Sequence, residues 1–288
     1  MTRIPAGLSE FWKLFRKNRQ GQLGLAIILF FLAMAVFAPW IAPIDPNATS
    51  PSLFLTPPSA AHPFGTDTLG RDLFSRNVYG ARISLLVGLA AGGLAIGLGL
   101  LAGIVSGYAG GLIDEAIMRV VDFFIIIPAL VFAIIIAALL GPSEVNVIVV
   151  IGVLSWAPTA RIIRAMVLSI KEWPFVESAK ANNAGSLYIM FRHVLPNVTS
   201  VLYANAMLAV SSAIFTQAAL VFLGVGDVTA ISWGGIIREA DQTGALIAGQ
   251  WYYFVPPGLF IFALILGFIL FGYSLEEIMN PRLRIIKA

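Results

Sequence analysis

The sequence predicts an all-α membrane protein that crosses the bilayer six times, and two observations lead to this fold class. Hydrophobic residues make up 59% of the 288-residue chain and charged residues only 11%, and the mean hydropathy is +0.90. A soluble domain carries about 25% charged residues and has no core large enough to bury so much apolar surface. The second observation is that the apolar residues form long runs without Asp, Glu, Lys or Arg, as helices in lipid require.

Six charge-free runs are candidates for membrane spans. A helix needs about 20 apolar residues to cross the hydrocarbon core, and five of the runs meet this length directly. The fourth run has only 16 residues, but apolar residues extend it to Leu168. The runs cover residues 20–44, 83–113, 123–143, 145–160, 193–226 and 242–274.

The first run predicts a retained span over residues 23–44. Its apolar part is longer than the h-region of a signal peptide, which is about 7–15 residues. Residues 8–20, before it, fit either an amphipathic helix on the membrane surface or a simple basic flank. After it comes a further charge-free segment, 46–66, which we expect to be a loop because frequent proline removes helical hydrogen bonds. Its prolines are Pro46, Pro51, Pro57, Pro58 and Pro63.

The second run is dense in glycine at four-residue spacing, which allows helix backbones to approach closely. The pairs are Gly88/Gly92 and Gly93/Gly97, and Gly99, Gly103 and Gly107 form a longer series. We expect tight helix packing here, with bending during gating as the alternative.

Basic residues predict that both termini lie in the cytoplasm. With this orientation the inner face holds 14 Lys and Arg and the outer face holds 4, as the positive-inside rule requires. The four outer residues are Arg71, Arg76, Arg82 and Arg238. The chain has no cysteine. The chain then divides into a cytoplasmic N-terminal segment 1–22, a first span 23–44, an extracytoplasmic loop 45–82, a core of five spans 83–275 and a cytoplasmic tail 276–288. Inside the core, residues 169–192 form a cytoplasmic loop and residues 224–250 an outer loop.

Polar residues form a stripe in the fifth run. Around a helix axis, Ser212 lies about 20° to one side of Asn205 and Thr216 about 20° to the other, and Ser155 and Thr159 make a similar pair in the fourth run. Such a stripe avoids lipid. Two interpretations stay open: hydrogen bonding between helices, or the lining of a translocation path.

Arg119 and Asp122 are one turn apart at the inner end of the third run, and we expect them to form a local ion pair. Pro128 is expected to kink the same helix. Asp122 is also a candidate for coupling to ion flow, although no acidic or histidine partner lies in mid-span to carry a proton onward.

The sequence contains no pattern for chemistry within this chain. It has no H-E-x-x-H zinc motif, and none of its lysines follows a glycine, so a Walker A phosphate loop is absent. We therefore expect no catalytic residue, no metal site and no bound cofactor. From the residues alone, an ion-coupled secondary carrier and a membrane enzyme or scaffold remain alternatives to an ATP-driven transporter.

The loop between the fourth and fifth runs contains a predicted partner-docking helix. Residues 172–197 read EWPFVESAKANNAGSLYIMFRHVLPN, and Pro174 is suited to begin a helix. A cytoplasmic helix with apolar Phe175 and Val176 beside charged Glu177 fits docking to another protein. Lying on the lipid surface is the alternative.

This segment resembles the EAA loop of importer permeases in the ATP-binding-cassette class. Glu177, Ser178 and Ala179 occupy the Glu-Ala-Ala positions, and residues 193–197 match the closing hydrophobic-Leu-Pro part. Asn183 stands where the family has glycine. Asn tolerates a left-handed turn better than most residues, and the alternative is that the turn moves to Gly185.

Further motifs resemble the second permease subunit of dipeptide, oligopeptide and nickel importers. They are residues 62–72 (HPFGTDTLGRD), 107–111 (GYAGG), 222–224 (FLG), 232–234 (SWG) and 280–284 (NPRLR). The resemblance implies an inner-membrane subunit that pairs with a homologous permease and receives solute from an extracytoplasmic binding protein. It also implies two cytoplasmic ATPase subunits that hold ATP and magnesium, and no nucleic-acid partner. The helix at 172–186 would transmit their motion to the spans in alternating access. Peptides are the leading solute, with nickel, glutathione and oligosaccharides as alternatives.

Overall fold

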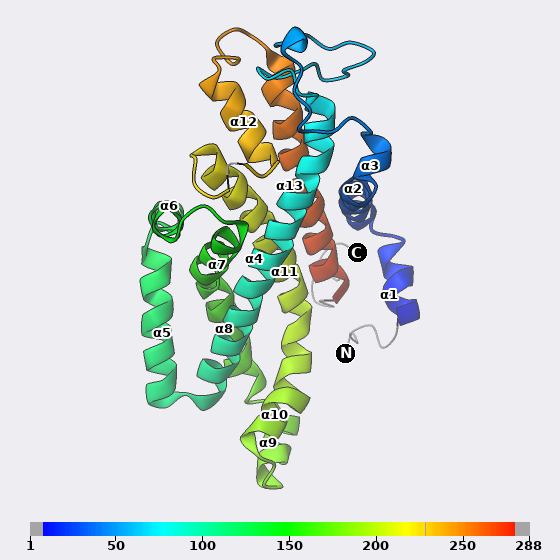
Figure 1. The fold of residues 1–288 in the computed structure, drawn as a ribbon. Helices are drawn as coiled ribbons and strands as arrows, with labels where there is room; N and C mark the ends of the chain where they lie inside the picture. Colours follow the sequence, from blue (N-terminus) through cyan, green and yellow to red (C-terminus); the bar gives the residue numbers. More distant parts are fainter. Residues whose placement is uncertain (1–7, 228, 280–288) are drawn as a thin grey trace.

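The computed structural model describes residues 8–227 and 229–279, which form helices joined by loops (Figure 1). The long helices are α2 (Arg19–Val36), α4 (Leu73–Ala109), α11 (Leu195–Phe222) and α13 (Trp251–Met279). The shorter ones are α1 (Leu8–Phe15), α3 (Ala38–Ile41), α5 (Gly111–Ile126), α6 (Ala129–Leu140), α7 (Glu144–Ser155), α8 (Ala157–Ile170), α9 (Pro174–Ala181), α10 (Ser186–Ile189) and α12 (Trp233–Gln242). A 3₁₀ turn covers Pro51–Leu53, and a π-helical turn, Met190–Val194, joins α10 to α11.

Within the described residues, α2, α4, α11 and α13 are each long and apolar enough to cross a membrane. Two bent pairs bring the total to six if each pair is one span: α5 with α6, bent by 91°, and α7 with α8, bent by 40°. The apolar run 123–143 is therefore not one straight helix. The structure confirms a kink at Pro128, and its cause is local: Ile127 is extended, as the residue before a proline tends to be, so α5 ends at Ile126.

The two ends of the bundle differ in structure. In Figure 1 one end carries α12 and the loop from α3 to α4, and we call it the α12 end. The other carries α9 and α10, and we call it the α9 end. Helices α4 and α11 pack along each other between these ends.

Close backbone approach at glycine holds the centre of the bundle together, as expected. Gly88 lies against Ile214 and Gly92 against Val210, both on α11. Along the rest of α4, Gly99, Gly103 and Gly107 lie against Thr159, Ile163 and Val167 of α8. Gly93 and Gly97 differ, because no described atom lies within 4 Å of the position a Cβ would take.

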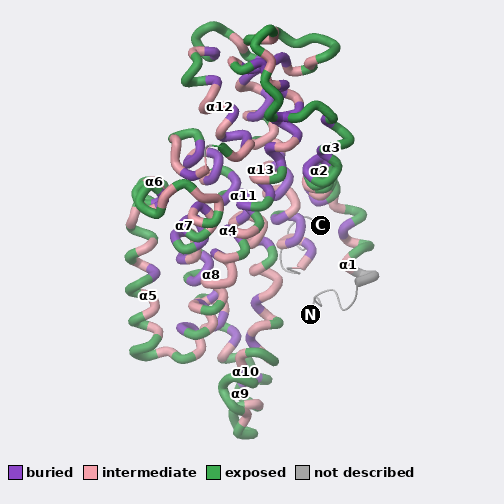
Figure 2. The backbone as a smooth tube through the Cα atoms, viewed as in Figure 1, coloured by how far each residue is buried: buried purple, intermediate pink, exposed green. Residues whose placement is uncertain are grey.

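Helices α5 and α6 are the least covered part of the bundle (Figure 2). In these two described helices, the only buried residues are Val121 of α5 and Ala133 and Ala137 of α6. Their exposed side chains are largely apolar, including Leu112, Ile126 and Leu139. Apolar exposure of this extent suits lipid or another membrane subunit rather than water.

Candidate functional site: a cavity between broken helices and a projecting segment

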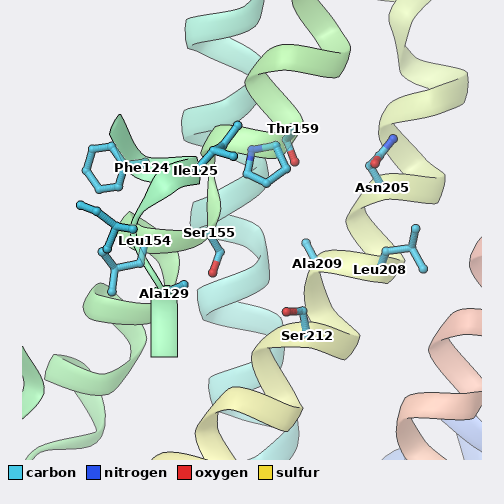
Figure 3. Close-up of a pocket in the computed structure, with 12 residues that line it drawn as sticks. Phe124, Ile125, Ala129, Leu154, Ser155, Thr159, Asn205, Leu208, Ala209 and Ser212 are labelled. Atoms are coloured by element: carbon cyan, nitrogen blue, oxygen red, sulfur yellow. The ribbon is translucent and has the colours of Figure 1, made fainter. Parts of the chain in front are cut away.

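A cavity of about 380 Å³ lies between α11 and the two bent helix pairs. Figure 3 shows Ser155 on one side of this space, and Asn205 and Ser212 of α11 on the other. We call it the α8–α11 cavity. Its lining consists of Phe124, Ile125, Ile127, Ala129, Leu154, Ser155, Pro158, Thr159, Asn205, Leu208, Ala209 and Ser212.

Four of the five residues expected to line a path border this cavity: Ser155, Thr159, Asn205 and Ser212. The amide Nδ2 of Asn205 donates to the Val201 carbonyl oxygen at 2.9 Å, so Asn205 is held by its own helix. Thr159 is only 6% exposed, and its Cβ packs at the Gly99 backbone. Thr159 therefore both packs against α4 and lines the cavity.

Thr216 does not line the cavity. It lies one turn beyond Ser212, the last α11 residue in the lining, and it is half-buried. The sequence places Thr216 on the same stripe as Ser212. The extent of the cavity along α11, however, depends on the two bent helix pairs that form its other wall.

Two proline breaks shape the cavity wall. Proline has no N–H, so Pro128 and Pro158 cannot bond the carbonyls four residues earlier, those of Phe124 and Leu154. Both of these residues line the cavity. Irregular backbone inside a membrane protein is tolerated where it lines a cavity, and broken helices commonly form solute sites. The break at Pro158 was not anticipated, although a proline within an apolar run was the available signal.

The predicted docking helix is present as α9, but its apolar residues divide between two faces. Val176 is 0% exposed and belongs to a small buried cluster that also contains Ile163 and Val167 of α8 and Ile189. The expectation that Val176 contacts a partner is therefore wrong, because its side chain is used within this chain. Phe175 is 41% exposed, Glu177 and Ser178 are exposed, and Ala179 is half-buried.

The turn after α9 lies at Asn183, not at Gly185. Asn183 has a φ of 55°, whereas Gly185 has a φ of −64°. The Asn183 amide donates to the Lys180 carbonyl at 3.0 Å and the Ala184 amide to the Ala179 carbonyl at 3.1 Å, which closes the end of the helix. Asn thus adopts the left-handed conformation at the position where the resemblance has glycine.

Aromatic side chains continue the exposed surface of α9. The Phe175 ring centroid lies 5.5 Å from that of Trp173 and 5.9 Å from that of His193. Tyr188 lies 5.6 Å from His193 on its other side. Sequence periodicity could not reveal this cluster, because a turn and a π-helical segment bring its members together.

The ion pairs of α5 are not those expected. Arg119 Nη2 lies 3.4 Å from Glu115 Oε1, and Asp122 Oδ1 lies 2.5 Å from Nη2 of Arg161 on α8. The predicted pair of Arg119 with Asp122 is therefore wrong. The face of α5 that carries Asp122 is turned toward α8, and Arg119 instead reaches the residue one turn earlier.

A buried charge network at the α12 end was not anticipated. Asp67 Oδ2 lies 2.6 Å from Arg71 Nε and 2.7 Å from Arg76 Nη1. Glu239 of α12 completes it, with Oε2 at 2.8 Å from Arg71 Nη2 and Oε1 at 2.9 Å from Arg76 Nη2. The Tyr253 hydroxyl of α13 also reaches Glu239 Oε2, at 3.4 Å. The network ties the loop before α4 to α12 and α13.

The fold and the cavity together define a class: a helical membrane protein whose broken helices border a cavity lined by apolar and polar side chains, as in solute-transporting proteins. Comparison with known proteins identifies the family. A family model described as binding-protein-dependent transport system inner membrane component matches residues 96–285. A second, described as the N-terminal TM domain of oligopeptide transport permease C, matches residues 8–58. The chain belongs to this family of inner-membrane transport components, and the resemblance inferred from its motifs is confirmed.

Relatives match over almost the whole chain. The chain is 37% identical to a di/tripeptide transport system permease protein, DppC, of Pseudomonas aeruginosa, covering 97% of this chain and 94% of the relative. It is 36% identical to the dipeptide permease protein DppC of Bacillus subtilis, over 96% of this chain and 86% of the relative. The oligopeptide permease protein OppC of the same organism is also 36% identical, over 94% of this chain and 88% of the relative.

Proposed function

We propose that this chain is one of two permease subunits in a binding-protein-dependent importer of di- or oligopeptides. The observation that carries the proposal is the α8–α11 cavity in a chain of this family. Its lining combines hydroxyl and amide groups with a larger number of apolar groups, which suits a peptide with both backbone polar groups and apolar side chains. A homologous permease would supply the opposite wall of the path.

Energy in this proposal comes from two separate ATPase subunits that hold ATP and magnesium and dock at the α9 end. The exposed groups there, Phe175, Glu177 and Ser178, together with Tyr188, would form the contact. Val176 and its neighbours anchor the helix to α8, so that a displacement of α9 reaches a helix whose first turn borders the cavity. Nucleotide and loaded binding protein would then shift the conformational equilibrium through differential affinity.

The same proposal orients the molecule. The α9 end faces the cytoplasm, where the ATPases are, and the α12 end faces the binding protein. The support is the excess of Lys and Arg on the predicted inner segments, 14 against 4.

Glu177→Lys in the reconstituted complex tests the coupling part of the proposal. Removing one partner of a desolvated ion pair in a docking groove costs about 2–5 kcal/mol of binding free energy. An exposed ion pair contributes only about 0–1 kcal/mol. We expect loss of ATPase co-purification and of solute-dependent ATP hydrolysis, while the permease pair still forms. Wild-type behaviour of this variant would contradict coupling through α9, and uptake driven without the ATPases would favour an ion-coupled carrier.

Substitutions on α11 test the path. Ser212→Leu places a larger apolar group in the cavity, and we expect it to reduce peptide uptake by about tenfold or more, equal to about 1.4 kcal/mol. Thr216→Leu is the matched control, since Thr216 lies outside the lining, and it should retain most uptake. Equal uptake by the two variants, with normal insertion, would show that the cavity is not the path.

A further inference from the structure

Four arginines lie at the α12 end, and three of them are satisfied within the chain. Arg71 and Arg76 belong to the network with Asp67 and Glu239. Arg82 donates from Nε to the Ala35 carbonyl at 2.7 Å, and its guanidinium lies 4.9 Å from the centre of the Tyr79 ring.

Arg238 of α12 is the exception. It is half-buried, yet no described residue gives it a hydrogen bond or an ion pair. A half-buried guanidinium has lost part of its hydration and gains more than an exposed one from a charged partner. Neither the sequence motifs, nor the packing of the helices, nor the proposed function gives this side chain a role.

Arg238 borders a second cavity, of about 340 Å³, between the end of α6 and residues 224–226. We call it the Arg238 pocket. Arg238 is the one charged side chain in its lining, and most of the other lining residues are small: Ala137, Ala138, Gly141, Gly224 and Gly226. None of its lining residues borders the α8–α11 cavity.

Gly224 makes room for the guanidinium. Its φ is 86°, and a Cβ placed on it would lie 2.9 Å from Arg238 Nη2 and 3.1 Å from Cζ. A side chain at this position would displace the charge from the wall. The absence of a side chain at Gly224 therefore lets the guanidinium lie close to the backbone at the pocket wall.

The acidic groups near the pocket do not neutralise Arg238. Asp227 Oδ1 instead accepts from the Thr229 amide at 2.9 Å and from the Thr229 hydroxyl at 2.6 Å, and these hydrogen bonds lower the pKa of the Asp227 carboxyl. The carboxylate oxygens of Glu144, at the start of α7, are buried with no hydrogen-bond partner among the described residues. Glu144 is therefore the carboxylate of this chain that could compete as a partner of Arg238, and the experiment below includes it.

We propose that Arg238 binds a carboxylate that arrives with the delivered solute at the α12 end. The planar guanidinium matches a carboxylate in a two-bond geometry that lysine cannot provide. The carboxylate comes either from the C-terminus of the peptide or from an acidic side chain of the binding protein that carries it. This inference rests on the proposed function and adds a recognition site to it, separate from the path.

The experiment uses the complete complex in proteoliposomes, with its ATPases and binding protein, and two solutes: a dipeptide and the same dipeptide with a C-terminal amide. Each solute is supplied at a concentration that saturates the binding protein, as measured separately. The readout is the concentration of loaded binding protein that gives half-maximal ATP hydrolysis. The variants are Arg238→Gln, Arg238→Lys and Gly224→Ala, and the control is Arg119→Gln, an exposed arginine at a distance from the pocket.

If the carboxylate belongs to the peptide, Arg238→Gln raises the half-maximal concentration about tenfold with the dipeptide and leaves it unchanged with the amide. If it belongs to the binding protein, the increase is about tenfold with both solutes. Arg238→Lys keeps the charge and should recover only part of the loss, and Gly224→Ala should resemble Arg238→Gln.

Three results would overturn the proposal. The first is an Arg238→Gln complex that behaves like Arg119→Gln with both solutes. The second is the same defect in Glu144→Gln, which would make Glu144 the partner of Arg238 within the chain. The third is an Arg238→Lys complex that assembles normally and has wild-type values with both solutes. A wild-type complex that hydrolyses no ATP in response to solute would instead count against the proposed function.

Discussion

The α12 end and the α9 end use charged and apolar side chains in opposite ways. At the α12 end, Asp67 is 0% exposed and Arg76 is 4% exposed, and their charges are matched within the chain. At the α9 end, a small apolar core around Val176 holds the segment in place, while Phe175 and Tyr188 remain exposed at 41% and 56%.

This difference separates a charge network that is completed within the chain from an aromatic surface that is left uncovered. The charge network links Arg76 to Glu239, 163 positions further along the chain, which stiffens the α12 end without help from another protein. The α9 segment satisfies its backbone and its inner face but leaves an aromatic and acidic surface uncovered. On the proposed function, the first end supports delivery of solute, and the second becomes complete only when the ATPases dock.

The largest expected effect comes from breaking the charge network. Arg76→Gln leaves Asp67 and Glu239 with one arginine fewer in a buried site, and removing one partner of a buried pair costs about 3–5 kcal/mol. The measurement is the free energy of unfolding of the purified chain in mixed micelles. Arg119→Gln removes the same charge from an exposed pair and should change stability by less than about 1 kcal/mol. Equal losses in both variants would contradict the claim that the buried network is worth more than an exposed ion pair.

A pair of substitutions on α9 sharpens the comparison. Val176→Ala empties part of the small core, and we expect roughly 1–3 kcal/mol of lost stability, seen as faster amide hydrogen exchange in α9. Phe175→Ala should leave exchange within α9 nearly unchanged and weaken ATPase binding by about tenfold or more. If the two variants exchange their effects, the assignment of an inner and an outer face to α9 is wrong.

The smallest effects are expected at the turn after α9. Asn183→Gly should be tolerated, with a change of less than about 0.5 kcal/mol, because glycine reaches a positive φ without steric cost. Asn183→Val should lose about 1–2 kcal/mol, because a branched side chain is strained in the left-handed region. Thermal unfolding of the complex measures both. Indifference to valine would mean that the turn can re-form elsewhere, for example at Gly185.

Several features of this protein followed from local rules. Long apolar runs determine where helices cross lipid, since no water is available there to bond the backbone. Glycine spacing marked most of the positions where α4 packs closely, although not Gly93 and Gly97, and Pro128 determined a break in the third span. Helix α9 and its turn were readable because caps and left-handed turns depend on residues only a few positions apart.

Tertiary structure alone decided the pairings between segments. The sequence could not show that Asp122 bonds Arg161, that Val176 points inward, or that the cavity ends before Thr216. Nor could it join Arg76 to Glu239, 163 positions further along the chain. These outcomes depend on how each helix is rotated about its axis and where it crosses its neighbours. The rotation and crossing angle of each helix are set by packing over the whole bundle. They cannot be predicted from residues that are only one or two turns apart.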